Sequence, residues 1–103
     1  MKNIKLKAAN DNVVVKLINN DISKINNLYV VSDDDVWYAE VIDKGENVKD
    51  DNSYEIGDVL ILVKNPGHYI FRYENGKYVI IDNREIRGII PKDDFEEFVK
   101  NIF

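Results

Sequence analysis

Residues 69–81 have the sequence YIFRYENGKYVII, in which two aromatic and β-branched runs flank one short turn. The runs extend from Tyr69 to Tyr73 and from Lys77 to Ile81, and Glu74-Asn75-Gly76 separates them. Asparagine and glycine both tolerate the positive φ that tight hairpin turns require. Asn75-Gly76 between two such runs therefore predicts a β-hairpin.

Further runs of the same kind lie on either side of this hairpin. Each is rich in β-branched residues, and turn residues such as Asn10-Asp11-Asn12 and Ile56-Gly57-Asp58 precede two of them. The predicted strands are Val13 to Ile18, Val36 to Ile42, Val59 to Val63 and Ile86 to Ile90. Short strands at this spacing in 103 residues predict an all-β fold, a small antiparallel β-barrel or sandwich, over residues 1–91.

The last residues, 92–103, have a different pattern. Asp93 is placed to cap a helix with Glu96 three residues on. Apolar residues then follow at helical spacing: Phe95, Phe98, Val99 and Ile102. We predict a short C-terminal amphipathic helix, laid on the barrel or used to bind a partner.

Two polar segments interrupt the strands. Asn19 to Asn27 has no apolar periodicity, so burial cannot offset the entropy of ordering it, and we expect a mobile loop over about 19–35. Leu28-Tyr29-Val30-Val31 is an apolar tetrad within that loop, and a short strand covering the barrel is its simplest interpretation. Lys44 to Ser53 is predicted to be a solvated loop.

Composition excludes several classes of protein. The 19 acidic against 14 basic residues, a net charge of −5, argue against a dedicated binder of nucleic-acid phosphates. The absence of cysteine excludes disulfides, thiol catalysis and Cys-type zinc sites. No apolar run approaches the roughly 18 residues of a membrane span, and no secretion signal precedes the strands. We expect a cytoplasmic protein that binds no membrane.

Groups that could carry chemistry are sparse. His68 is the only histidine, no Ser or Cys motif accompanies it, and it is interpreted as a surface turn residue. Asp33-Asp34-Asp35 and Asp50-Asp51 lack the spacing of a calcium loop, and the glycines never form a phosphate-binding cluster. We expect no enzymatic activity, no metal site and no cofactor.

The aromatic residues of the hairpin raise one further possibility. Side chains of this kind stack on bases in oligonucleotide-binding barrels, and here they are Tyr69, Phe71, Tyr73 and Tyr78. Strand alternation assigns much of this stripe to the core, and few basic residues lie near it. Nucleic-acid binding is therefore disfavoured.

A series of short motifs follows in a recognisable order. Along the chain they are Asn10-Asp11-Asn12-Val13-Val14-Val15-Lys16, then Asn26-Asn27 with Leu28-Tyr29-Val30, then Ala39-Glu40-Val41-Ile42, then Tyr54 to Ile61, and finally Tyr78 to Ile81 with Glu85 to Ile90. Their order and spacing resemble those of the ten-kilodalton co-chaperonins, the GroES family, over roughly Ile4 to Ile90. The resemblance implies a small GroES-like antiparallel β-barrel.

The resemblance also implies a function. Members of the family form rings, usually of seven subunits, that cap an ATP-driven GroEL-type chaperonin and enclose unfolded substrate proteins. The chaperonin binds and hydrolyses the ATP, so the lid itself needs no cofactor. Residues carried over to the chaperonin contact at the loop tip are Asn26, Asn27, Leu28, Tyr29, Val30 and Val31. Those carried over to the subunit interface, where terminal strands of neighbours pair, are Ile4, Lys5, Leu6, Ile86, Gly88, Ile89 and Ile90.

The physics of such a loop fits this role. A segment that orders only when bound makes individually weak contacts, and several identical loops on one ring raise the effective concentration of the later contacts. Departures from the family are Asn26-Asn27 in place of Gly-Gly, Tyr29 in the apolar triplet, a shortened roof loop over about 44–55, and the added helix. The last two resemble phage-encoded co-chaperonins, which act in the host cytoplasm. The alternative is a non-catalytic β-barrel adaptor or structural module, derived from a phage, that has lost chaperonin binding.

Overall fold

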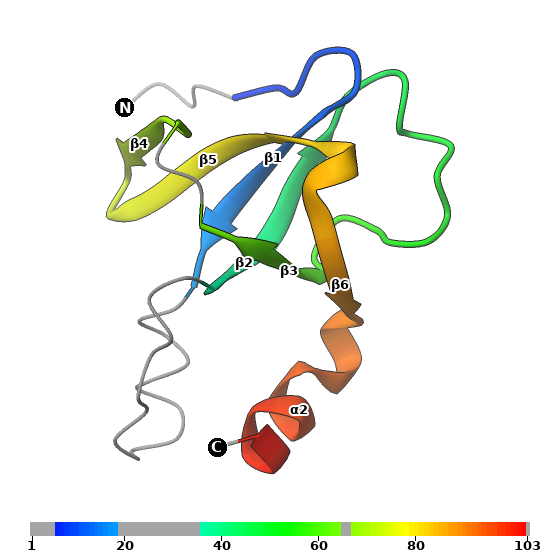
Figure 1. The fold of residues 1–103 in the computed structure, drawn as a ribbon, viewed down its shortest axis with the longest axis vertical. Helices are drawn as coiled ribbons and strands as arrows, with labels where there is room; N and C mark the ends of the chain where they lie inside the picture. Colours follow the sequence, from blue (N-terminus) through cyan, green and yellow to red (C-terminus); the bar gives the residue numbers. More distant parts are fainter. Residues whose placement is uncertain (1–5, 19–35, 65–66, 103) are drawn as a thin grey trace.

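The computed structural model describes residues 6–18, 36–64 and 67–102, apart from the side chains of residues 99, 101 and 102. These residues form one six-stranded antiparallel sheet and a short C-terminal helix (Figure 1). The strands are β1 (Asn12–Leu17), β2 (Val36–Lys44), β3 (Val59–Val63), β4 (Ile70–Tyr73), β5 (Gly76–Asp82) and β6 (Ile86–Ile90). Their order in the sheet is β4-β5-β1-β2-β3-β6. The predicted strands and the antiparallel all-β class are confirmed.

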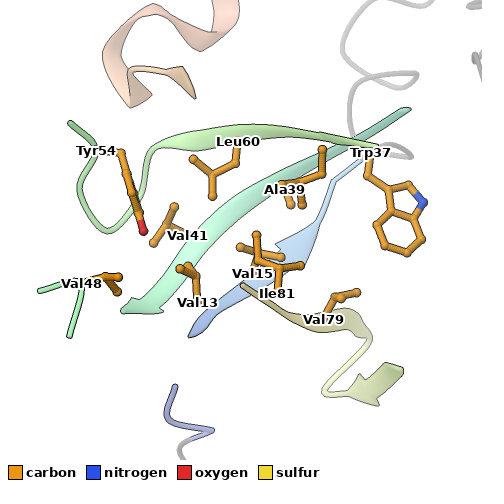
Figure 2. Packing of buried hydrophobic residues seen from close by; sticks show 11 residues of the cluster. Val13, Val15, Trp37, Ala39, Val41, Val48, Tyr54, Leu60, Val79 and Ile81 are labelled. Atoms are coloured by element: carbon orange, nitrogen blue, oxygen red, sulfur yellow. The ribbon is translucent and has the colours of Figure 1, made fainter. Parts of the chain in front are cut away.

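The core lies on the inner face of a strongly curved sheet. Val13, Val15, Ala39, Val41 and Leu60 are fully buried there, and side chains from β1, β2, β3 and β5 converge on one cluster (Figure 2). Strands β5 and β6 are not neighbours in the ladder, yet the three-residue turn η1 (Asn83–Glu85) joins them and both pack on this cluster. The curvature therefore encloses the core between the two halves of the sheet.

The β4–β5 hairpin is confirmed, but its turn lies one residue earlier than predicted. Tyr73 pairs with Gly76, so Glu74 and Asn75 are the two turn residues, with φ of 47° and 66°. Gly76 opens β5 and is buried, and a Cβ there would lie 3.0 Å from the Lys16 Cε. Asn75 tolerates the left-handed backbone of the turn. Gly76 is therefore needed for its small size, which lets neighbouring side chains pack against it, and not for its backbone conformation.

The connection between β2 and β3 is exposed over most of its length, as predicted for a solvated loop over Lys44 to Ser53, but Lys44, Gly45 and Val48 are buried. Val48 belongs to the core cluster, and the Lys44 side chain is 7% exposed. The Lys44 ammonium donates to the carbonyl oxygens of Asp51 and Tyr54 and lies 4.3 Å from the centre of the Tyr54 ring. The cation–π contact and the two carbonyl acceptors together stabilise the charged ammonium group in its buried position. From its charge alone, this lysine would be expected in solvent.

The Ile56-Gly57-Asp58 turn fixes the start of β3. Gly57 has a φ of +100°, which favours glycine. The Asp58 carboxylate accepts from the backbone N–H of Glu55 at 2.8 Å and from that of Lys92 at 3.0 Å. This buried carboxylate thus ties the β2–β3 connection to the segment that follows β6.

The C-terminal helix is confirmed, but its predicted cap is wrong. Asp93 lies inside a 3₁₀ turn, η2 (Lys92–Asp94), whose N-cap position is Pro91, and helix α2 (Phe95–Ile102) begins after it. Phe95 and Phe98 pack against a second apolar cluster built from Ile18, Val59 and Ile90. The helix lies beyond the end of β6 (Figure 1), and its two phenylalanines pack on apolar side chains of β3 and β6.

Candidate functional site

The predicted chaperonin contact lies outside the described residues. It comprises Asn26, Asn27, Leu28, Tyr29, Val30 and Val31, all within 19–35. The two strands that carry this segment are well defined: the Ile18 N–H donates to the Tyr38 carbonyl at 2.9 Å, and Val36 pairs with Val63. Residues 19–35 therefore leave from, and return to, adjacent antiparallel strands in the middle of the sheet.

The predicted subunit interface is described in part. Ile4 and Lys5 lie outside the described residues, whereas Leu6 is 38% exposed. Ile86, Gly88, Ile89 and Ile90 lie on β6, which pairs with β3 on one side and forms an edge of the described sheet on the other. An unpaired strand edge presents backbone donors and acceptors to a neighbouring chain.

A groove lies between β6 and the C-terminal helix, and we call it the helix groove. Its apolar wall consists of Ile61, Ile89, Ile90 and Phe98, and its acidic rim consists of Asp94 and Glu97. Its volume is about 430 Å³. Gly88 keeps the groove open, since a Cβ at this position would lie 3.1 Å from the Ile61 Cδ1.

A second groove lies at the β4–β5 end of the sheet, and we call it the N-terminal groove. Leu6 and Ile42 line it together with Phe71 and Tyr78, and its volume is about 630 Å³. Lys7 and Arg72 are its basic groups. The Asp43 carboxylate accepts from the Ala8 N–H at 2.8 Å and so holds the N-terminal segment against β2.

The aromatic stripe of the hairpin is exposed, which contradicts the assignment of much of it to the core. Tyr69, Ile70 and Phe71 are 81%, 46% and 42% exposed, and we call them the β4 patch. Tyr73 and Tyr78 are half-buried, with their rings 6.0 Å apart in an edge-on contact. Strand β4 is the other edge of the sheet that the described residues form.

His68, which was interpreted as a surface turn residue, lies in the β3–β4 turn, but its side chain is largely buried. Its side chain is 12% exposed, its Nε2 lies 2.7 Å from the Glu85 Oε1, and its ring centre lies 5.9 Å from that of Trp37. The other Glu85 oxygen accepts from the Asp82 N–H and completes a capping box on η1. His68 thus connects the β3–β4 turn to η1, a structural role that no local sequence pattern indicated.

Two shifted pKa values mark strong local interactions. Hydrogen bonds from the Arg84 side chain and backbone hold the pKa of Asp82 below its usual value. Burial raises the pKa of Tyr54 to about 12, with the Asp51 charge as a smaller cause, and the Tyr54 hydroxyl donates to the Asn83 Oδ1 at 2.6 Å. Asp82 is the last residue of β5, and Tyr54 contacts the first residue of η1, so both groups stabilise the connection between β5 and β6. Neither residue lines the helix groove or the N-terminal groove.

Within the described ranges, no group of three or more His, Asp or Glu side chains is arranged to hold a metal ion. No helix among these residues is long and apolar enough to cross a membrane. A scan against models of known protein families and a search of curated proteins both find no match for this chain. The two edge strands and the two grooves are therefore the features from which a function is inferred.

Proposed function

We propose that this chain is a co-chaperonin of the GroES type. In this role its subunits form a ring that binds a GroEL-type chaperonin through residues 19–35 and closes a chamber around unfolded substrate proteins. The curved antiparallel sheet would be a small β-barrel, and the partner would supply all ATP chemistry. The protein would act in the cytoplasm, and in the host cytoplasm if a phage encodes it.

The observation that carries the proposal is the position of the two terminal segments in the sheet. Leu6 and Lys7 lie beside the β4–β5 hairpin, whereas β6 is the opposite edge strand. Pairing of an N-terminal segment with β6 therefore joins different copies of the chain. Such head-to-tail contacts generate rings when the rotation closes.

Two further features support the same role. Residues 19–35 connect two central strands whose ends are fixed by hydrogen bonds, as a binding loop on a rigid scaffold requires. The β2–β3 connection is compact, with Val48 in the core, and this supports the reduced roof of the phage-encoded type.

The test is ATP-dependent capture by a GroEL-type chaperonin. Leu28→Asp places a charge in the apolar triplet, so we expect capture to be abolished while the mass of the assembled protein in solution is unchanged. Ile56→Asp is the matched control, because Ile56 is an exposed apolar residue (55%) outside the loop and both grooves, and it should be captured like the wild type.

The outcomes separate the alternatives. Capture of Leu28→Asp at the wild-type level would show that the contact lies elsewhere than the triplet. A wild-type protein that forms an assembly but is not captured would instead support the adaptor or structural module.

A further inference from the structure

The two ends of the sheet are unlike each other in shape and in charge. At one end the β4 patch exposes three apolar side chains, two on the edge strand β4 and that of Tyr69 just before it. At the other end the helix groove is a hollow with an apolar wall and an acidic rim, Asp94 and Glu97. Exposed apolar side chains that are neighbours in the chain at a strand edge mark an interaction surface.

The charges at the hairpin end have a pattern that needs a partner. Arg72 and Lys77 are directly opposite each other in the β4–β5 ladder, and both are exposed. Like charges in this position repel each other and destabilise a hairpin. Lys7 adds a third positive charge beside Arg72. These three positive charges exceed the two carboxylates at this end, Asp43 and Glu74, so the complement of this end is an acidic surface.

We infer that the β4 patch of one copy docks into the helix groove of the next copy, with Arg72 and Lys77 facing Asp94 and Glu97. The contact is heterologous, because the patch and the groove lie at opposite ends of one sheet, and so it repeats from copy to copy and forms a ring when the rotation closes. Charge complementarity selects this occupant and sets the orientation of the two copies. The inference rests on the ring of the proposed function and assigns to α2 a place in its subunit contact.

The experiment measures molar mass by light scattering over a range of protein concentrations. Tyr69→Asp should lower the mass from several times the 12.0 kDa of one chain toward that of a single chain. Tyr69 is 81% exposed, so its replacement leaves the core intact. Ile56→Asp introduces the same charge at an exposed apolar residue outside both surfaces and should retain the wild-type mass.

A charge exchange provides a second measurement. Arg72→Glu and Glu97→Arg should each reduce assembly, and the double variant should recover it, because the exchanged pair restores opposite charges. The effect of each single variant should decrease as salt is added, since ionic screening weakens interactions between exposed charges. Recovery in the double variant also shows that the two substitutions together leave the chain folded.

The possible outcomes separate this inference from the proposed function. If the wild type assembles and is captured by the chaperonin while Tyr69→Asp and both charge variants keep full mass, the docking is wrong and the co-chaperonin proposal stands. If the variants behave as expected but no chaperonin captures the wild type, the docking stands and the co-chaperonin proposal falls. A wild-type monomer at every concentration, or a closed dimer, overturns the docking.

Discussion

Gly45 lies so close to other backbone atoms that the fold has no space for a larger side chain at this position. A Cβ at residue 45 would lie 2.3 Å from the Asn10 carbonyl oxygen and 2.9 Å from that of Asn12. Both oxygens are held in place, since Asn10 accepts from the Asn47 N–H and Asn12 from the Gly45 N–H. No side-chain movement relieves this contact, so the turn after β2 requires glycine for space.

Gly45→Ala should therefore reduce the free energy of unfolding by at least about 2 kcal/mol, because backbone atoms must move to accommodate the methyl group. Gly76→Ala is the matched control, since its closest contacts are the ends of the flexible Lys16 and Tyr78 side chains. Denaturant unfolding measures both. Equal losses in the two variants would contradict the argument from backbone contact.

Tyr54 makes stability depend on alkaline pH. Its pKa is raised to about 12 in the folded protein by burial, against about 10 in an unfolded chain. The folded state thus binds the phenol proton more tightly than the unfolded chain does. The resulting contribution to the free energy of unfolding is fully present below pH ~10 and is lost as the pH rises through ~12. Tyr54→Phe has no phenol to ionise, so it should lose less stability at alkaline pH than the wild type. The measurement is the midpoint of denaturant unfolding as a function of pH.

The control for this prediction is Tyr69→Phe, which changes a phenol that is 81% exposed and should leave the pH profile as in the wild type. Tyr54→Phe also loses the hydrogen bond to Asn83, so its stability at neutral pH should fall by about 1 kcal/mol. Identical slopes for the wild type and Tyr54→Phe above pH ~10 would contradict the assignment.

Among the elements, α2 has the clearest structural task. Phe98 lies 6.4 Å from the Tyr38 ring, between ring centres, and packs with Phe95 on the cluster that contains Ile18, the residue just before position 19. The helix thus covers apolar surface on three strands and supports the base of the β1–β2 connection.

Phe98→Ala should cost roughly 1–3 kcal/mol of unfolding free energy, less than the roughly 3–5 kcal/mol of a fully buried phenylalanine, because Phe98 is only half-buried. Phe98→Leu should restore most of this loss, since it keeps an apolar side chain in the cluster. Thermal unfolding followed by circular dichroism measures both variants. A Leu variant as unstable as the Ala variant would point to the aromatic contact with Tyr38 as the main stabilising interaction.

Elements with strong local patterns were predictable from the sequence. The β-branched run of β1 and the two runs of the hairpin predict strands, and the helical spacing of Phe95 and Phe98 predicts α2. The exposure of Tyr69 and Phe71 was not predictable, because alternation is the same in a covered strand and in an edge strand. The pairing of His68 with Glu85 joins positions 17 residues apart and leaves no local pattern.

At the scale of the whole molecule, the chain has two unlike ends and a core enclosed between the halves of one sheet. The apolar β4 patch and the helix groove add surface that a single copy leaves in water. Under the proposed assembly, stability and association are linked, because association that involves only the folded state shifts the unfolding equilibrium.

The melting temperature should therefore rise with protein concentration in the wild type. Tyr69→Asp should remove most of this dependence, since it weakens association without changing the core. Calorimetry or fluorimetry over a wide concentration range measures the effect. A wild-type melting temperature that does not change with concentration would contradict a link between folding and assembly.

Trp37 provides an intrinsic optical probe of these events. It is the only tryptophan of the chain, it is 7% exposed, and it follows Val36, the first residue described after position 35. Its indole ring lies beside the His68 imidazole at the start of β2. Emission from this one fluorophore, in wavelength and in quenching by iodide, therefore reports changes at the base of residues 19–35 without any added label.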